Sequence, residues 1–209
     1  MEGLPQILIA VIPIYILMVV GGGLRRVRVL GPEMDDGLTK LVIHVLYPAL
    51  ILDKVLRAEL LRDPVVVVSA IGVGFTIIVI GLLVALLIGR LIGLRKGTGW
   101  RSFTLTAGVQ NYGYVAIPLL MVFFPQNETA VLGLLFTHSL GVELGVWTLG
   151  MFILRGKPFK SPREFVSGPM VAVVVGLLLV FSRIDVLVEN SKAAAFLFGT
   201  FLNLLHWLG

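Results

Sequence analysis

The sequence contains no cysteine and few charged residues. Without cysteine, the chain has no disulfide bond, no thiolate metal ligand and no cysteine nucleophile. Charged residues make up 14% of the 209 positions, whereas a soluble domain typically has about a quarter. Hydrophobic residues account for 57% of the chain, and the mean hydropathy is +1.01. Water is therefore not the main solvent of this protein.

The sequence motifs of common enzyme classes are also missing. The chain has no HExxH zinc motif, GxSxG nucleophile elbow, phosphate-binding loop or dinucleotide-binding GxGxxG. His138 and Ser139 are adjacent, and adjacent residues on a helix point apart, so they do not suit the roles of base and nucleophile. The net charge of +5 does not indicate nucleic-acid binding, because Lys and Arg fall between apolar runs and form no contiguous basic face. We predict a protein that is not an enzyme, uses no cofactor and binds no nucleic acid.

Long apolar runs dominate the sequence instead. About 20 residues of helix cross the roughly 30 Å of hydrocarbon in a bilayer. Runs of about this length occupy residues 4–23, 38–56, 65–92, 101–124, 129–154, 166–182 and 193–209. They predict an all-α integral membrane protein, a multi-helix bundle that forms a single transmembrane domain over residues 1–209. The first run lacks the basic start of a signal peptide, because no Lys or Arg precedes Arg25, so we expect it to be retained.

The basic residues predict how the helices are oriented, because Lys and Arg in short loops stay on the cytoplasmic side. They cluster after the first, third and fifth runs, at Arg25, Arg26 and Arg28, at Arg90, Arg95, Lys96 and Arg101, and at Arg155, Lys157, Lys160 and Arg163. The loop PQNET after the fourth run has none. The loop after the second run is a mild exception to this alternation, because it contains Lys54, Arg57 and Arg62. Acidic residues that include Asp53 balance their charge. We predict a multi-pass protein of the cytoplasmic membrane with its N-terminus outside.

The fourth run carries helix-breaking residues in its middle. Pro118 has no N–H to donate to the carbonyl of the residue four positions earlier, and Gly113 weakens the preceding turn. Asn111 adds a polar side chain. Backbone groups freed at this depth are tolerated only where protein or a wet cavity satisfies them. The pattern predicts a helix broken near residues 111–118, whose half-helix ends face a bound solute or ion, and a proline-kinked structural helix is the alternative.

Glu143 lies near the middle of the fifth run, where an acidic side chain is costly and marks a functional candidate. Pairing with a polar group of another helix, for packing alone, is the alternative. His138 is five residues away, roughly 140° around the helix, so it does not share a face with Glu143. Lys40 and His44 can share a face of the second run, but Lys40 is close to the membrane edge. His44 and His206 are interpreted as structural.

The residues of the fourth run also resemble a known family, the auxin efflux carriers, which are secondary transporters. NYGYVAIPL at residues 111–119 is similar to the family's fourth-helix pattern of Asn, small polar, Gly, aromatic, aliphatic, Gly, aliphatic, Pro and aliphatic. Residues 7–30, 38–52 and 167–179 are similar to its first, second and sixth helices. The sequence departs from the pattern at Tyr112, where a small polar residue is usual, and at Ala116, where Gly is usual.

The resemblance implies a fold of ten helices in two inverted repeats of five, with the fourth and ninth helices broken and crossing near the midplane. The chain would then be the first half of this fold plus the first two helices of the second repeat. Because the last run ends while still apolar, we expect a longer chain to continue beyond it. The resemblance assigns the first, second, sixth and seventh helices to a scaffold and the third to fifth to half of a moving transport domain.

The substrate site is expected at the crossing. The resemblance places Asn111, Gly113 and Pro118 there, and we add Tyr112 and Glu143 as candidate binding residues. The leading prediction is secondary active transport, by efflux or uptake, of a small organic anion and most simply a carboxylate, since family members carry such anions. Expected partners are this anion, a coupling proton or sodium ion, the lipid bilayer and a second copy of the chain. A non-transporting membrane fragment, scaffold or sensor of the same ancestry is the alternative.

The predicted orientation can be tested with single cysteines, because the chain has none of its own. We expect Asn127→Cys, in the PQNET loop, to react with a membrane-impermeant maleimide on intact cells. Lys157→Cys should react only after permeabilisation, because its basic loop is predicted to be cytoplasmic. The reverse pattern of labelling would contradict the orientation.

Overall fold

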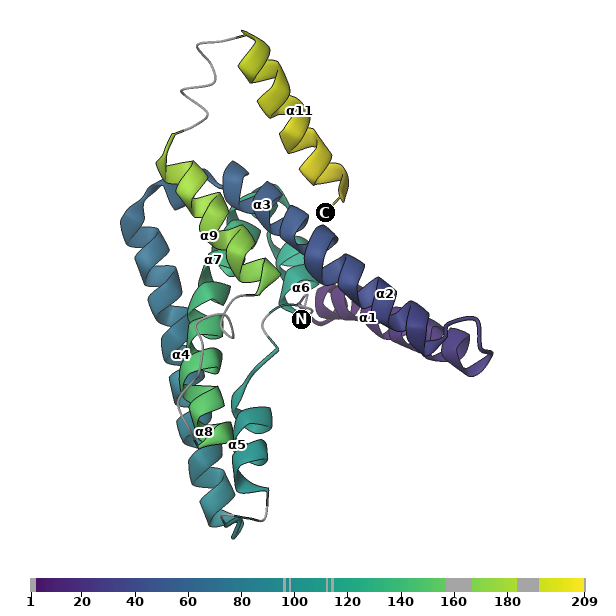
Figure 1. The fold of residues 1–209 in the computed structure, drawn as a ribbon, viewed down its shortest axis with the longest axis vertical. Coiled ribbons are helices and arrows are strands. Elements are labelled where there is room, and N and C mark those ends of the chain that lie inside the picture. Colours follow the sequence, from purple (N-terminus) through teal and green to yellow (C-terminus); the bar gives the residue numbers. More distant parts are fainter. Residues whose placement is uncertain are drawn as a thin grey trace.

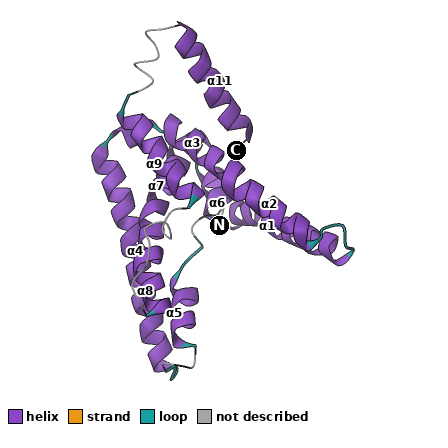
Figure 2. Cartoon of the chain, viewed as in Figure 1, coloured by secondary structure: helices purple, strands orange, loops and turns teal. Residues whose placement is uncertain are grey.

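The computed structural model describes residues 3–95, 97, 99–111, 113, 115–156, 167–183 and 192–208 of the chain. All regular structure in these residues is helical, as Figure 2 shows. By length and composition, three helical stretches are suited to cross a membrane, namely Ile7–Arg26, Pro64–Leu91 and Pro125–Arg155. The predicted all-α membrane fold is therefore confirmed.

The helices follow one another with short connections. They are α1 (Gly3–Arg26), α2 (Pro32–Leu41), α3 (Tyr47–Arg57), α4 (Pro64–Leu91), α5 (Trp100–Gly108), α6 (Ala116–Phe123), α7 (Glu128–Gly145), α8 (Met151–Arg155), α9 (Gly168–Phe181) and α11 (Lys192–Leu208), with short 3-10 turns at Glu59–Arg62 and Pro125–Asn127. Two π-helical turns, η1 (Val42–Leu46) and η4 (Val146–Gly150), continue the backbone from α2 to α3 and from α7 to α8. Residues 32–57 and 128–155 therefore each form one longer helical segment.

The segment 32–57 begins earlier than the second apolar run. Pro32 lies in its first turn, where the missing N–H is not needed and the fixed φ suits a helix. Glu33 and Asp35 bring negative charge to the N-terminal amides, and Asp35 also pairs with Arg25 at 3.1 Å. Polar residues that favour helix initiation thus extend this helix beyond its apolar part.

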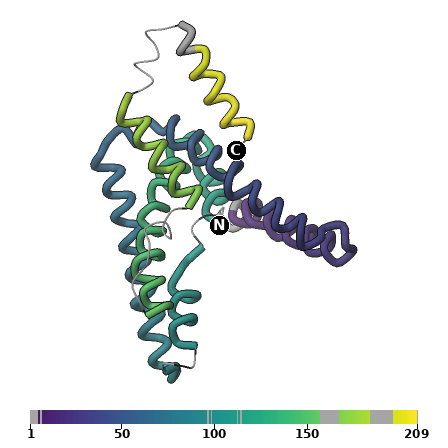
Figure 3. Tube along the Cα trace, viewed as in Figure 1, coloured from purple at the N-terminus to yellow at the C-terminus, as the bar shows by residue number. Residues whose placement is uncertain are grey.

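The long axis of the molecule is formed by α4, α5, α7 and α8 (Figures 1 and 3). α4 packs extensively along both α7 and α5. α3 packs against α7, α9 and α11, while α1 contacts α6. α1 and α2 extend away from this axis to one side in Figure 1. α7 is therefore the helix that joins the α4–α5 pair to the α3–α9 pair.

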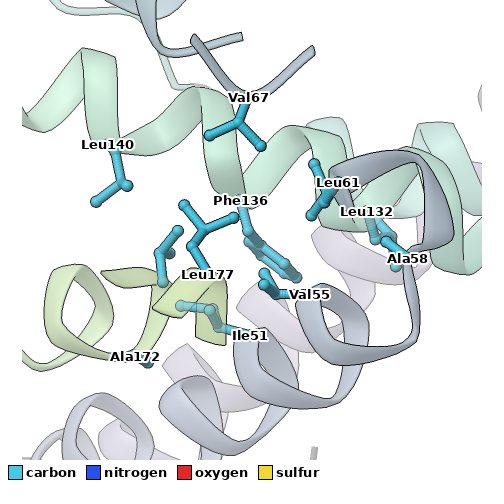
Figure 4. Packing of buried hydrophobic residues seen from close by; sticks show 11 residues of the cluster. Ile51, Val55, Ala58, Leu61, Val67, Leu132, Phe136, Leu140, Ala172 and Leu177 are labelled. Atoms are coloured by element: carbon cyan, nitrogen blue, oxygen red, sulfur yellow. The ribbon is translucent and has the colours of Figure 1, made fainter. Parts of the chain in front are cut away.

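Phe136 of α7 lies at the centre of the main hydrophobic core (Figure 4). It is 1% exposed, and Ile51 and Val55 of α3 and Leu177 of α9 belong to the same buried cluster. Tyr47 meets the Phe136 ring edge-on, with the ring centroids 5.9 Å apart, in the T-shaped geometry that aromatic pairs favour. This core fixes α3 and α9 against one face of α7.

Glycines allow α4 and α7 to approach closely on the opposite side. A Cβ on Gly74 would meet the backbone carbonyl of His138, and a Cβ on Gly141 would meet that of Ile71. Contacts through small residues are typical of helix pairs in membranes, where van der Waals packing replaces the hydrophobic effect as the main attraction. The two helices therefore form a tightly packed pair.

Several charges assigned to the loop after the second run lie inside a helix, so that assignment is wrong. α3 continues to Arg57, and within it Asp53 is 1% exposed and Lys54 is 8% exposed. Arg57 Nε donates to Asp53 Oδ1 at 2.7 Å, and Lys54 Nζ donates to Glu128 Oε1 at 2.9 Å. His206 Nδ1 lies 3.3 Å from Asp53 Oδ2. Buried charges persist where each has a partner of opposite sign.

Gly74→Ala tests the close packing of α4 and α7, and Gly72→Ala on the same helix is its matched control. A Cβ on Gly72 meets nothing within 4 Å. We expect Gly74→Ala to destabilise the detergent-solubilised protein by about 1–3 kcal/mol, the usual effect of overpacking. Gly72→Ala should leave stability unchanged or raise it, because Ala favours a helix more than Gly does. Thermal unfolding followed by circular dichroism measures both, and equal melting temperatures would contradict the close packing.

Candidate functional site

The fourth apolar run is interrupted, as predicted. α5 ends at Gly108 and α6 begins at Ala116, and the two helices are separated along the long axis in Figure 1. Val109 has an extended conformation, with φ −98° and ψ 114°. A Cβ on Gly108 would lie 3.0 Å from the carbonyl oxygen of Gly81 in α4. The first half-helix therefore ends where it is packed closely against α4.

Pro118 lies beyond the break, so the predicted break near 111–118 extends too far along the chain. α6 already includes Ala116 and Ile117, and the Ile117 N–H donates to the Gly113 carbonyl at 2.9 Å. Pro118 is the third residue of α6. Amides in the first turn of a helix have no partner within that helix, so proline is tolerated at this position. Pro118 thus belongs to the start of the second half-helix.

A cavity of about 580 Å³ opens beside the break. Asn111 and Gly113 line it from the break, and Glu143 lines it from α7. Further lining residues include Tyr47, Gln110, Val146, Trp147, Ser167 and Pro169. Three of the predicted site residues, which the sequence places on two different helices, therefore meet in one cavity.

The other predicted site residues have different positions. Tyr112 lies outside the described residues. Pro118 is not among the described residues that line the cavity. His138 lines a second, mostly apolar cavity of about 660 Å³ with residues of α4 and α6. His138 and Glu143 thus face different cavities, in agreement with their angular separation on the helix.

Glu143 is held by a residue from another helix. Its Oε2 accepts a hydrogen bond of 2.7 Å from Ser167 Oγ. Ser167 is the N-cap of α9, and its Oγ also accepts a bond of 3.1 Å from the Met170 N–H. Glu143 therefore has a polar partner from another helix and also lines the cavity, and both alternatives drawn from the sequence, a binding residue or a packing residue, stay open.

Both π-helical turns border this cavity. Ile43 belongs to η1, and Val146 and Trp147 belong to η4. Single π-turns interrupt α-helices frequently at functional sites. They widen the backbone locally beside Tyr47 and after Glu143, which are themselves lining residues. The cavity is therefore bordered by three irregular backbone segments, the two π-turns and the break.

Sequence reasoning missed Tyr47, Trp147 and Ser167. Ser167 carried a usable signal, because Ser followed by Gly-Pro before an apolar run is typical of an N-cap. That signal locates the start of α9 but does not identify Glu143 as its partner. For the π-turns that border the cavity beside Tyr47 and at Trp147, we find no corresponding signal in the sequence.

The described lining of the cavity combines one acidic side chain with neutral polar groups. Among its described lining residues, Glu143 is the one Asp, Glu, Lys, Arg or His. The Asn111 and Gln110 amides can donate or accept hydrogen bonds, and the amino end of α6 contributes partial positive charge. No group of three or more His, Asp and Glu that would hold a metal ion occurs in the described part of the chain. The site is suited to a polar organic molecule.

A comparison with protein families found one match over most of the chain. The model of a family described as membrane transport protein matches residues 6–166. The matched part includes the break and Glu143, and it ends immediately before Ser167. No match was found among curated proteins or among solved structures.

Proposed function

The chain belongs to the membrane transport protein family, the auxin efflux carrier type that its sequence resembles, and we propose that it moves a small organic anion across the cytoplasmic membrane by secondary active transport. The observation that carries this proposal is the cavity at the interrupted helix, where Asn111 and Glu143 meet. Secondary transporters commonly bind substrates at such discontinuous helices. The break is also the kind of backbone that hydrocarbon excludes unless it lines a cavity.

A carboxylate is the simplest substrate for this chemistry. The Asn111 amide can donate a hydrogen bond to it, and Gln110 adds a second amide on the same segment. The amino end of α6 adds partial positive charge, which favours anions. The apolar body of the substrate would lie against Tyr47 and Trp147, which line the same cavity. This cavity therefore provides both polar contacts and aromatic surface.

Alternating access requires two groups of helices that move relative to each other. The resemblance assigns α3 and α9 to a scaffold and α4, α5 and α7 to the moving part. In the described residues, the polar contacts that cross between these groups include Lys54 to Glu128 at 2.9 Å and Ser167 to Glu143 at 2.7 Å. Close glycine contacts at Gly74 and Gly141 lie within the moving group, and one at Gly133 crosses from α7 to the end of α3. We infer that the α4–α7 pair moves as a unit and that the two polar contacts break and re-form.

Asn111→Ala should weaken substrate binding more than folding. Loss of one hydrogen bond to a charged group lowers affinity about tenfold to a hundredfold. We expect this loss for radiolabelled succinate or indole-3-acetate, measured as binding to purified protein and as uptake into proteoliposomes. The melting temperature should change little, because Asn111 lies at the cavity and not in the core.

Asn127→Ala is the matched control, since Asn127 is an exposed residue of the same type outside this cavity. The affinity of Asn127→Ala for succinate and for indole-3-acetate should equal that of the parent protein. Unchanged affinity in Asn111→Ala would place the binding site elsewhere. Failure of the parent protein to bind or transport any carboxylate of a broad panel would overturn the proposed function.

A further inference from the structure

The charge of the cavity poses a problem for an anionic substrate. Glu143 is the one acid among the described lining residues, and no Lys, Arg or His accompanies it there. A carboxylate substrate would therefore bring a second negative charge into a site that already has one. Like charges repel strongly where water is scarce. Asn111 and the end of α6 provide only dipoles and no full positive charge.

None of the described basic groups on the neighbouring helices lines the cavity. Lys40 and His44, on the segment that contains Ile43, are exposed, and Lys40 Nζ pairs with Asp36 at 2.7 Å. Arg101 lies in the first turn of α5, at the end away from the break.

α6 and α9 contain no charged residue, and α4 contains none between Pro64 and Gly89. The charges of α3 at Asp53 and Lys54 are engaged with one another and with Glu128, at the far end of α7. Tyr47 is the other titratable residue in the described lining, and a phenol is neutral near pH 7. Within the described residues, a proton on Glu143 is the available means of removing its charge.

We propose that Glu143 binds the coupling proton, so that one proton moves together with each anion. This inference rests on the proposed function and specifies its coupling ion. In the empty site the Glu143 carboxylate takes up one proton to become a carboxylic acid, and the anion then binds beside it. No other covalent bond forms or breaks. The proton removes the charge of Glu143, so the site with a proton and a monocarboxylate has the same charge as the empty site, and the site with a proton and succinate has one more negative charge.

The contact with Ser167 suits both protonation states. Ser167 Oγ donates to Oε2 of the ionised carboxylate, and it can donate equally to the carbonyl oxygen of the neutral acid. The other oxygen of the neutral acid then carries the proton and can donate it to the substrate carboxylate. Hydrogen bonds between a carboxylic acid and a carboxylate are short and charge-assisted. Glu143 thus changes from a repelling group to a hydrogen-bond donor while its position stays fixed.

Glu143→Gln isolates this role, because its amide resembles the neutral acid in shape and can still accept from Ser167. For the parent protein, we expect succinate affinity to fall by about tenfold per pH unit over the range in which Glu143 is ionised in the empty site. Succinate is itself almost fully ionised between about pH 7 and pH 8.5, so the test uses this range. Glu143→Gln should bind succinate with an affinity that does not vary with pH.

Transport assays distinguish Glu143→Gln further from the parent protein. Proteoliposomes that contain a trapped pH-sensitive dye should acidify when succinate enters through the parent protein, and an inward proton gradient should drive accumulation. Glu143→Gln should exchange labelled for unlabelled succinate, which also shows that it is folded, but should neither acidify the lumen nor accumulate succinate. Glu59→Gln, at an exposed acid outside the cavity, is the matched control and should behave as the parent protein.

Two results would overturn the inference while leaving the proposed function intact. One is proton-coupled accumulation of succinate by Glu143→Gln at the parent level. The other is accumulation by the parent protein that needs a sodium gradient and ignores a proton gradient. Absence of carboxylate binding by the parent protein at every pH would instead remove the proposed function and the inference together.

Discussion

The constraint on which the structure depends is the absence of water around most of the chain. In hydrocarbon each backbone N–H and C=O needs a partner inside the protein, so helices are the form that single segments can take. All regular structure in the described residues is accordingly helical. The same constraint applies to the interruption between Gly108 and Ala116, because non-helical backbone within a membrane is tolerated where it lines a cavity or is buried in protein. The cavity with Asn111 and Glu143 is found there.

Packing and polar contacts have different roles in this arrangement. The glycine contacts between α4 and α7, at Gly74 and Gly141, leave no room for a Cβ and therefore resist sliding. The contacts from α7 to α3 and α9 combine an apolar core around Phe136, polar links at Glu128 and Glu143, and one close glycine contact at Gly133. A hydrogen bond or ion pair can exchange its partner for water or substrate, whereas close-packed backbones cannot. The α3–α9 side of α7, where polar links accompany a single close glycine contact among the described residues, is therefore better suited to movement than the α4 side.

The two polar links also differ from each other. Lys54 and Glu128 form a part-buried ion pair that Asp53 and Arg57 extend, so removal of one member would leave an uncompensated charge. The Glu143 link has a neutral partner, Ser167, and lies at a cavity. A charge with a neutral partner can be removed by a proton without leaving another charge unpaired. This difference favours Glu143 over Glu128 as the site of the proposed coupling proton.

The sequence by itself determined the solvent of the protein and the helical class of its segments, because hydropathy and length depend on local composition alone. It also identified an interrupted fourth helix from Asn111, Gly113 and Pro118, and it marked Glu143 because an acid in an apolar run is conspicuous. Only the tertiary structure decided that Asn111 and Glu143 share a cavity, that Ser167 holds Glu143, and that Asp53 and Lys54 are internal partners. These facts depend on which faces of separate helices meet. Such contacts join residues far apart in the chain, and no periodicity within one segment encodes them.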